Sequence, residues 1–184
     1  SFRTALAGAP AAPRSIVNSS GLYLDPNWVG ELARPGKSLA GINPLPPGEP
    51  NPMQQAMLVE APVLQVRRVG RGDSIGYSEG YRATRPIIVA TLGIGYTNGY
   101  LRSLTNRGVV AFHGIRAPVV GRVSMDLVTV DVTDVPAPAL APGVAEMLGP
   151  TIGLSELAQL ADSNEHEMQI ALGRGCPRKY IGGD

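Results

Sequence analysis

The stretch VSMDLVTVDV at residues 123–132 has an alternating pattern, in which valine occupies every second position from 128 to 132. Val128, Val130 and Val132 share one face of an extended chain, and the residues between them share the other face. Because successive side chains point to opposite sides of a strand, this period of two predicts a strand that buries its valine face. The expected fold class of this part of the chain is therefore mainly β.

Other segments with strand-like patterns lie upstream of this stretch. Residues 86–94 are rich in Ile and Val, and His113-Gly114 lies between two apolar runs, as a hairpin connection does. Downstream, Ser155 is a candidate helix cap, and Met168, Ala171 and Leu172 are spaced for a second short helix that ends at Gly173. The predicted strands are at 57–69, 86–94, 108–112, 115–120 and 123–132, and the first of the two helices is at 155–161.

The N-terminal part reads differently. Residues 15–18 are expected to form a short apolar strand, and polar residues follow it, which is where α/β folds place ligand contacts. Asp25 followed by Pro26 predicts a helix start, and we expect that helix to end near Leu32.

A proline-rich linker separates the N-terminal part from the segments with strand patterns. Residues 43–52, NPLPPGEPNP, hold five prolines, which no helix or central strand tolerates. We therefore expect residues 1–50 to be the end of an α/β unit with its linker, and residues 51–184 to be a β domain.

Composition excludes several function classes. The 184 residues carry a formal net charge of +1 with acids and bases interspersed, which argues against a nucleic-acid partner. No apolar run is long enough to span a membrane, and no metal-ligand spacing is present. The single cysteine, Cys176, indicates a reducing, cytoplasmic compartment. Lysine occurs only at 37 and 179, and histidine only at 113 and 166.

Two groups of residues are candidates for chemistry. The hydroxyl of Ser19, the adjacent amides of Gly36 and Lys37, and the cation of Arg34 are groups that hold a phosphate. Tyr77 lies in the glycine-bracketed segment GYSEGY, and a desolvated tyrosine can carry a proton. Simpler interpretations stay open for both groups: turn closure for Ser19 and ring packing for the tyrosine.

Seven motifs in order resemble the alanine racemase family of pyridoxal phosphate enzymes. They are NSS at 18–20, ARPG at 33–36, GYSEGY at 76–81, IGYTNGYLRSL at 94–104, NRG at 106–108, APVVGRVSMDLVTVDVTDVP at 117–136 and CPRKY at 176–180. This resemblance implies the last segments of an α/β (TIM-type) barrel followed by the family's C-terminal β domain. It also implies a homodimer whose active site is shared across the subunit interface.

The resemblance assigns roles residue by residue. Tyr77 matches the tyrosine that moves a proton on one face of the substrate, opposite the cofactor lysine. Met125 matches the residue whose backbone N–H meets the substrate carboxylate. Ser19, Gly36 and Lys37 match donors to the phosphate of pyridoxal phosphate, Arg34 matches the partner of its ring nitrogen, and Tyr96, Arg102, Arg122 and Asp126 match the entrance corridor.

Three departures qualify the resemblance. The lysine motif of the family, of the type VKANAYGHG, is absent, and neither Lys37 nor Lys179 takes its place. We therefore expect the chain to be inactive without the N-terminal barrel portion. His166 stands where the family usually has a tyrosine near the cofactor phosphate, and Thr97-Asn98 replaces the usual Ala-Asp pair.

The expected function is part of an amino-acid racemase that interconverts L- and D-alanine by two-base proton transfer. Two other interpretations stay open. A broad-specificity racemase is consistent with His166, because histidine is smaller than tyrosine. A non-catalytic dimerisation module is the other, although it has no evident need of Tyr77, Met125 or Arg34.

Overall fold

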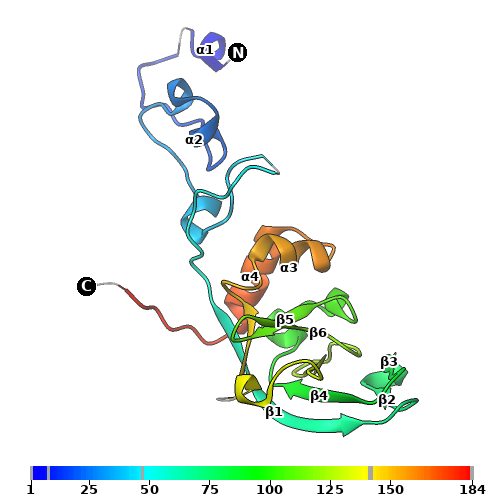
Figure 1. Cartoon of the computed structure of the whole chain (residues 1–184). Coiled ribbons are helices and arrows are strands. Elements are labelled where there is room, and N and C mark those ends of the chain that lie inside the picture. Colours follow the sequence, from blue (N-terminus) through cyan, green and yellow to red (C-terminus); the bar gives the residue numbers. More distant parts are fainter. Residues whose placement is uncertain (1, 8, 47, 141–142, 183–184) are drawn as a thin grey trace. The chain divides into compact units, whose positions relative to one another are not determined.

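The computed structural model describes residues 2–7, 9–46, 48–140 and 143–182 (Figure 1). The chain divides into a first unit, Ser1–Ala56, and a second unit, Met57–Asp184. Among the helices of the described ranges, none combines the length and apolar content needed to cross a membrane.

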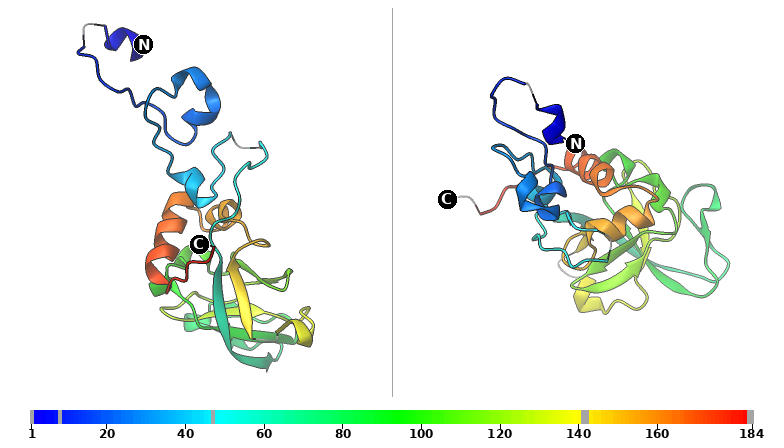
Figure 2. Two further views of the ribbon diagram at one scale, coloured as in Figure 1. Left: turned by 90° about the vertical axis from the view of Figure 1, so that its left-hand side faces the viewer. Right: turned by 90° about the horizontal axis from the view of Figure 1, so that it is seen from above.

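The second unit is built on a six-stranded sheet in which each neighbouring pair is antiparallel. A bridge between Val119 and Val130 joins its two edges, so the sheet is nearly closed (Figure 2). Closure leaves few unpaired edge groups, which suits a small β domain. The strands are β1 (Val59–Val69), β4 (Ile87–Leu92), β5 (Val109–Phe112), β6 (Ile115–Pro118), β7 (Val128–Asp131) and β8 (Val144–Leu148), in the order β6-β5-β8-β1-β4-β7. The predicted mainly β fold is confirmed.

The valine face predicted for the end of the 123–132 stretch is the buried face. Val128, Val130 and Val132 are each at most 1% exposed. β7 pairs with β4, and the buried Val89 and Leu92 lie opposite Asp131 and Val128. Full burial of such side chains contributes about 1.5–3 kcal/mol each, so the alternation is what commits this segment to the sheet.

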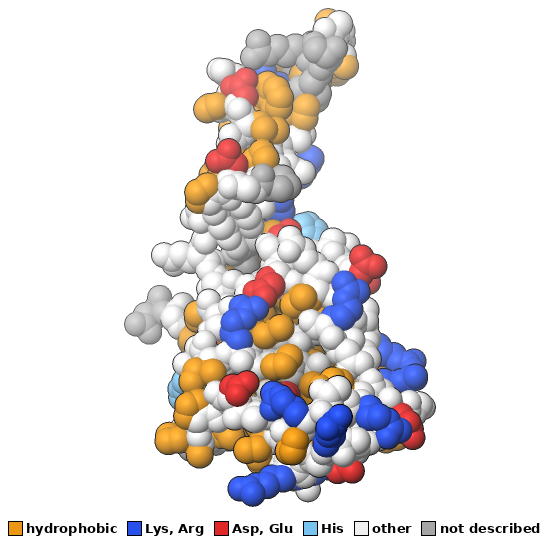
Figure 3. Space-filling view, turned by 45° about the vertical axis from the view of Figure 1, so that its right-hand side comes forward, with side chains coloured by type: hydrophobic (Ala, Val, Ile, Leu, Met, Phe, Trp, Pro, Cys, Tyr) orange, Lys and Arg blue, Asp and Glu red, His pale blue; other side chains and the backbone are white. Residues whose placement is uncertain are grey.

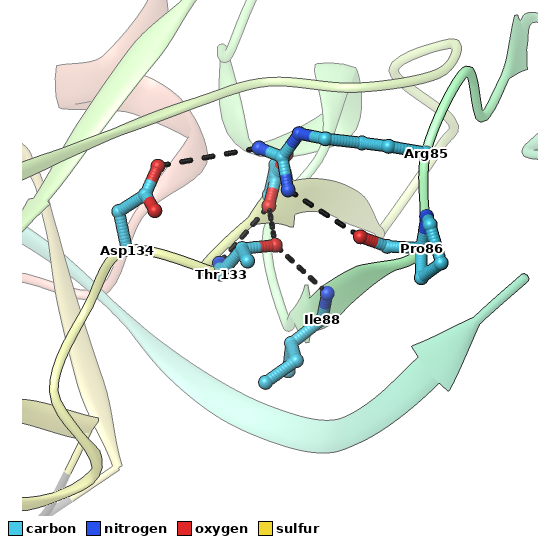
Figure 4. A network of polar contacts seen from close by, with 6 residues as sticks. Arg85, Pro86, Ile88, Thr133 and Asp134 are labelled. Atoms are coloured by element: carbon cyan, nitrogen blue, oxygen red, sulfur yellow. Dashed lines mark hydrogen bonds and ion pairs between the residues drawn. The ribbon is translucent and has the colours of Figure 1, made fainter. Parts of the chain in front are cut away.

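A network of polar contacts lies at the C-terminal end of β7 (Figure 4). The guanidinium of Arg85 lies 3.3 Å from Asp131 and 4.0 Å from Asp134. Asp131 accepts hydrogen bonds from the backbone N–H and the hydroxyl of Thr133, whose Oγ1 accepts from Ile88 N at 2.9 Å. The network ties the start of β4 to the chain that leaves β7.

Two helices accompany the sheet, and both differ from the prediction. α3 (Leu154–Leu160) is capped by Gly153 rather than Ser155, because the Ser155 hydroxyl bonds Glu165 instead. α4 (Glu165–Gly175) starts at the cap Asn164 and continues past Gly173, because tertiary packing of Met168 and Leu172 outweighs glycine's low helix propensity. The two helices pack against each other.

The turns of the second unit follow the sequence more closely. His113 and Gly114 both have positive φ, at 48° and 83°, as a two-residue hairpin turn requires. The strand predicted for the first half of the 123–132 stretch is wrong, because residues 124–127 form a turn. Ser124 N donates to Leu127 O at 3.0 Å, and Leu127 N donates to Ser124 Oγ at 3.0 Å. A serine hydroxyl that satisfies a nearby backbone group competes with sheet pairing in this way.

In its described residues, the first unit contains only short elements. These are α1 (Phe2–Ala5), α2 (Gly21–Leu24) and the 3-10 helices η1 (Pro26–Trp28) and η2 (Lys37–Ala40). Asp25 caps η1 as predicted, but the helix stops at Trp28, before Gly30 with its φ of 64°. The predicted strand at 15–18 is reduced to one parallel bridge, Asn18 with Arg34, because a parallel strand needs neighbours that this unit does not supply. Residues 43–46 and 48–52 contain no helix or strand.

Candidate functional site

An open hollow of about 610 Å³ lies on the second unit. Its lining comes from four short segments that follow or join strands, at 77–78, 96, 102 and 122–127. Six predicted site residues are among them: Tyr77, Tyr96, Arg102, Arg122, Met125 and Asp126. The fold thus brings together residues that lie up to about 50 positions apart in the sequence.

Tyr77 opens a 3-10 helix, η3 (Tyr77–Glu79), between the paired strands β2 (Ser74–Ile75) and β3 (Tyr81–Arg82). The turn is tight: Gly76, Ser78 and Glu79 have φ values of 77°, 52° and 50°. The Tyr77 ring is 73% exposed, and its hydroxyl has no hydrogen-bond partner in the described part of the chain. The phenol is therefore presented outward, free to meet a molecule that enters the hollow.

Two arginines and one carboxylate set the charge of the lining. Within the described ranges, neither Arg102 nor Arg122 has an ion-pair partner, and the lining's carboxylate is that of Asp126. On the face that Figure 3 shows, basic and acidic side chains are interspersed. Two guanidinium groups against one carboxylate leave net positive charge at the hollow, which favours an anionic group such as an amino-acid carboxylate.

Met125 offers a backbone donor at the same place. Its N–H donates to no acceptor among the described residues, while its carbonyl oxygen accepts from Thr97 N at 3.0 Å. A backbone N–H without an internal partner is suited to bind a carboxylate oxygen. Gly95 makes this arrangement possible, because a Cβ there would overlap the Ser124 and Met125 carbonyl oxygens.

Thr97 is a site residue whose role the sequence did not reveal. Its hydroxyl lies 2.8 Å from Met125 O and 2.6 Å from Asp126 Oδ1, across 28 and 29 positions of sequence. The 3-10 helix η4 (Tyr96–Asn98) thereby holds the Met125–Asp126 turn in place. The replacement of Ala-Asp by Thr-Asn was the only sign of it.

Thr97→Val is expected to destabilise the chain by about 1–2 kcal/mol, because it keeps the side-chain volume but removes the hydroxyl whose one proton is shared between Met125 O and Asp126 Oδ1. Thr97→Ser keeps the hydroxyl and is expected to stay within about 0.5 kcal/mol of the wild type. Urea unfolding of both variants measures the difference. Equal loss in the two variants would show that the methyl group, not the hydroxyl, is what matters.

Tyr100 follows η4 in the chain, and the sequence assigned it no role. Its ring is fully buried, and its hydroxyl has no partner among the described residues. Burial raises the pKa of Tyr100 well above the ordinary value of 10. A Cβ at Gly108 would lie about 2.5 Å from the phenol oxygen, so glycine is needed there.

The first unit gathers part of the predicted phosphate group. Ser19 is only 3% exposed, and its Oγ accepts from Gly36 N at 2.9 Å and Ser38 N at 3.3 Å. Ser19 Oγ thus occupies both amides, and the hydroxyl keeps its own proton to donate. A hydroxyl and backbone amides gathered in this way are donor types that hold a phosphate group. Lys37 begins η2 beside them. The Arg34 guanidinium turns back to Ser15, where it donates to the carbonyl oxygen at 3.2 Å and to Oγ at 3.1 Å.

His166 lies on the exposed first turn of α4 and is not part of the lining of the hollow. Contact between His166 and a cofactor phosphate stays a prediction. In the described ranges, no group of three or more His, Cys, Asp or Glu side chains is placed to hold a metal ion.

The fold and the hollow together define a small, nearly closed β domain that presents a tyrosine, a free backbone donor and net positive charge at one surface. A sequence model described as "Alanine racemase, C-terminal domain" matches residues 56–180. The chain belongs to this family.

Curated alanine racemases are similar to this protein over nearly all of its 184 residues. The chain is 42% identical to the alanine racemase of Rhodospirillum rubrum over 182 residues, which are 98% of this chain and 48% of that protein. It is 41% identical to the catabolic alanine racemase of Mesorhizobium japonicum, over 99% of this chain and 47% of that protein. The crystal structure of alanine racemase from Bartonella henselae with covalently bound pyridoxal phosphate matches with a TM-score of 0.90 and 36% identity, covering 98% of this chain and 50% of that chain. The chain spans about half the length of the curated relatives it matches.

Proposed function

We propose that these residues are the tyrosine-bearing part of an alanine racemase that uses pyridoxal phosphate. The observation that carries the proposal is the hollow, where Tyr77, Met125 and four predicted corridor residues meet in a chain of this family. Residues 1–50 would be the end of the barrel with its linker, and residues 51–184 the β domain. The proposal also includes the N-terminal barrel portion, a second subunit that shares the active site, and a cytoplasmic location.

Tyr77 performs the proton transfer in this scheme. Its phenol exchanges a proton with the α-carbon of the substrate on one face, while the lysine of the barrel portion serves the other face. Met125 N–H and the positive charge of Arg102 and Arg122 orient the substrate carboxylate. Asp126, held by Thr97, limits that positive charge, and Tyr96 narrows the approach.

The first unit would hold the cofactor. The hydroxyl of Ser19 and the amides of Gly36 and Lys37 would donate to its phosphate, and Arg34 would donate to its ring nitrogen. A guanidinium does not give up its proton, so Arg34 binds the nitrogen without protonating the ring. Pyridoxal phosphate itself supplies electron withdrawal from the α-carbon, and an unprotonated ring limits that withdrawal and so suppresses side reactions.

The cofactor lysine is the part that the barrel portion must supply. We expect the 184-residue chain, mixed with pyridoxal phosphate and treated with borohydride, to show no stoichiometric lysine adduct by peptide mass mapping. Addition of the barrel portion is expected to produce racemase activity and one adduct on a barrel lysine. A stoichiometric adduct on Lys37 or Lys179 would contradict this assignment.

His166 is the residue that distinguishes narrow from broad substrate specificity. If histidine opens the pocket, then His166→Tyr in the assembled enzyme raises the ratio of kcat/KM for alanine to that for larger amino acids by about tenfold. His166→Phe is the matched control, because it restores ring bulk without the hydroxyl. An unchanged ratio in both variants would remove the support for a broad-specificity racemase.

A further inference from the structure

The turn that carries Tyr77 is anchored at its base by the pairing of β2 with β3 and by the packing of Tyr81, but its tip has few contacts of its own. Ser78 and Glu79 both adopt the left-handed conformation, which costs roughly 1–2 kcal/mol per non-glycine residue. The Tyr77 ring is exposed and has no polar partner in the described chain. The Glu79–Arg82 ion pair is exposed on both sides, so it stabilises the turn only weakly. Contacts from outside residues 76–82 therefore help to set where the phenol lies.

Asn106 makes the two contacts that do so. Its Nδ2 donates to Gly80 O at 2.7 Å, and its Oδ1 accepts from Gly121 N at 2.6 Å. Gly80 O belongs to the Tyr77 turn, and Gly121 precedes Arg122. One side-chain amide therefore joins the two segments that bring the tyrosine and an arginine to the hollow.

The chemistry of both partners requires this residue type. Gly80 presents a carbonyl acceptor and Gly121 an N–H donor, so the orientation of the Asn106 amide is fixed and both of its ends are used. Asn106 itself has a φ of 55°, a conformation that asparagine tolerates better than most residues. Two glycines of the Tyr77 turn lie close to the Arg122 backbone. A Cβ at Gly80 would lie 2.8 Å from Arg122 N, and one at Gly76 would lie 3.0 Å from it, so glycine permits this close approach.

We infer that Asn106 is a positioning residue, which holds the Tyr77 turn in register with Gly121-Arg122 and so sets the place of the phenol in the hollow. The inference rests on the proposed function only for its effect on catalysis. The tether itself is a property of the described chain. It gives a role to the NRG segment at 106–108, to which the sequence motifs assigned none.

Two variants separate the two bonds. Asn106→Asp keeps the left-handed tolerance and the acceptor for Gly121 N, but it removes the donor to Gly80 O. Asn106→Gly keeps the conformation and removes both bonds. Asp162→Gly is the matched control, because Asp162 also has a positive φ, at 54°, in a turn on another part of the second unit.

Hydrogen–deuterium exchange of the 184-residue chain tests the tether. We expect exchange of the amides that the β2–β3 pairing protects to rise at least tenfold in both Asn106 variants and to stay unchanged in Asp162→Gly. The Gly121 amide should remain protected in Asn106→Asp and lose protection in Asn106→Gly. Unchanged exchange of the β2 and β3 amides in both Asn106 variants would overturn the inference, whatever the activity.

The assembled racemase tests the consequence for catalysis. Asn106→Asp is expected to lower kcat 10- to 100-fold with KM changed less than threefold, and to shift the alkaline limb of the kcat–pH profile. A purely structural role would lower the amount of folded enzyme and leave that profile in place, and this result would overturn the positioning role. Raised exchange with an unchanged kcat would support the tether and count against Tyr77 as the proton carrier, which separates failure of the proposed function from failure of the inference.

Discussion

Replacing Tyr77 with phenylalanine is expected to lower kcat for alanine racemisation in the assembled enzyme by about 10²- to 10⁴-fold, the range typical of a lost general acid–base group. Phenylalanine keeps the ring and removes the phenolic hydroxyl that the η3 turn presents to the hollow. Because each turnover needs one proton transfer on each face, both directions of racemisation should fall together. Initial rates in both directions, with chiral separation of the products, measure the effect.

Tyr81 is the matched control for this experiment. It lies four residues further on in the same segment and packs against the buried cluster of Val69, Ile75, Ala83, Ile87, Val89 and Val120. Tyr81→Phe keeps that packing, so we expect kcat within about threefold of the wild type. If Tyr77→Phe kept more than a tenth of the activity, or if Tyr81→Phe lost as much, the proton carrier would have to be another group.

Isotope exchange gives a second readout for Tyr77. In D₂O, the variant should still exchange the α-hydrogen of one alanine enantiomer, on the face served by the barrel lysine. Exchange from the other enantiomer should fall with kcat. Equal exchange from both enantiomers would show that a single group serves both faces.

Tyr100→Ala is expected to destabilise the chain by about 3–5 kcal/mol, because it empties a fully buried ring site. Tyr100→Phe is expected to be neutral or to stabilise by about 1 kcal/mol, since it removes a buried hydroxyl that has no partner among the described residues. Urea unfolding measures both changes. Tyr180→Ala is the control, because that side chain is 85% exposed and its loss should change stability by less than about 0.5 kcal/mol.

The pH dependence of stability separates the hydroxyl from the ring. Below pH 10 the phenol of Tyr100 is protonated in both the folded and the unfolded chain, so the full stability is present. Burial raises the pKa of Tyr100 in the folded chain. Above pH 10 the unfolded chain therefore releases a proton that the folded chain keeps, and stability falls by up to about 1.4 kcal/mol per pH unit.

The difference in the free energy of unfolding between wild type and Tyr100→Phe isolates the titration of Tyr100, since the other titrating groups are shared. The variant should become more stable relative to the wild type as pH rises above 10. A difference that stayed flat from pH 8 to 11 would mean that the buried hydroxyl is in contact with water or another partner.

Local sequence patterns predicted the elements whose causes are local. The alternation through Val128, Val130 and Val132 marked a buried strand face, and His113-Gly114 marked a hairpin turn. Patterns were misleading where a side chain found a distant partner. Ser155 read as a cap, yet its hydroxyl bonds Glu165, and the first half of the 123–132 stretch became a turn that is held from η4.

The sequence by itself determined the mainly β fold, the family and the residue types of the site, because periodicity and motif order are written along the chain. Only the tertiary structure decided which residues hold that site in shape. Thr97 meets Asp126 across 29 positions, and Asn106 meets Gly80 across 26. Hydrogen bonds of this kind depend on angles and distances that are defined only once the strands have paired, so no local pattern marks them in advance.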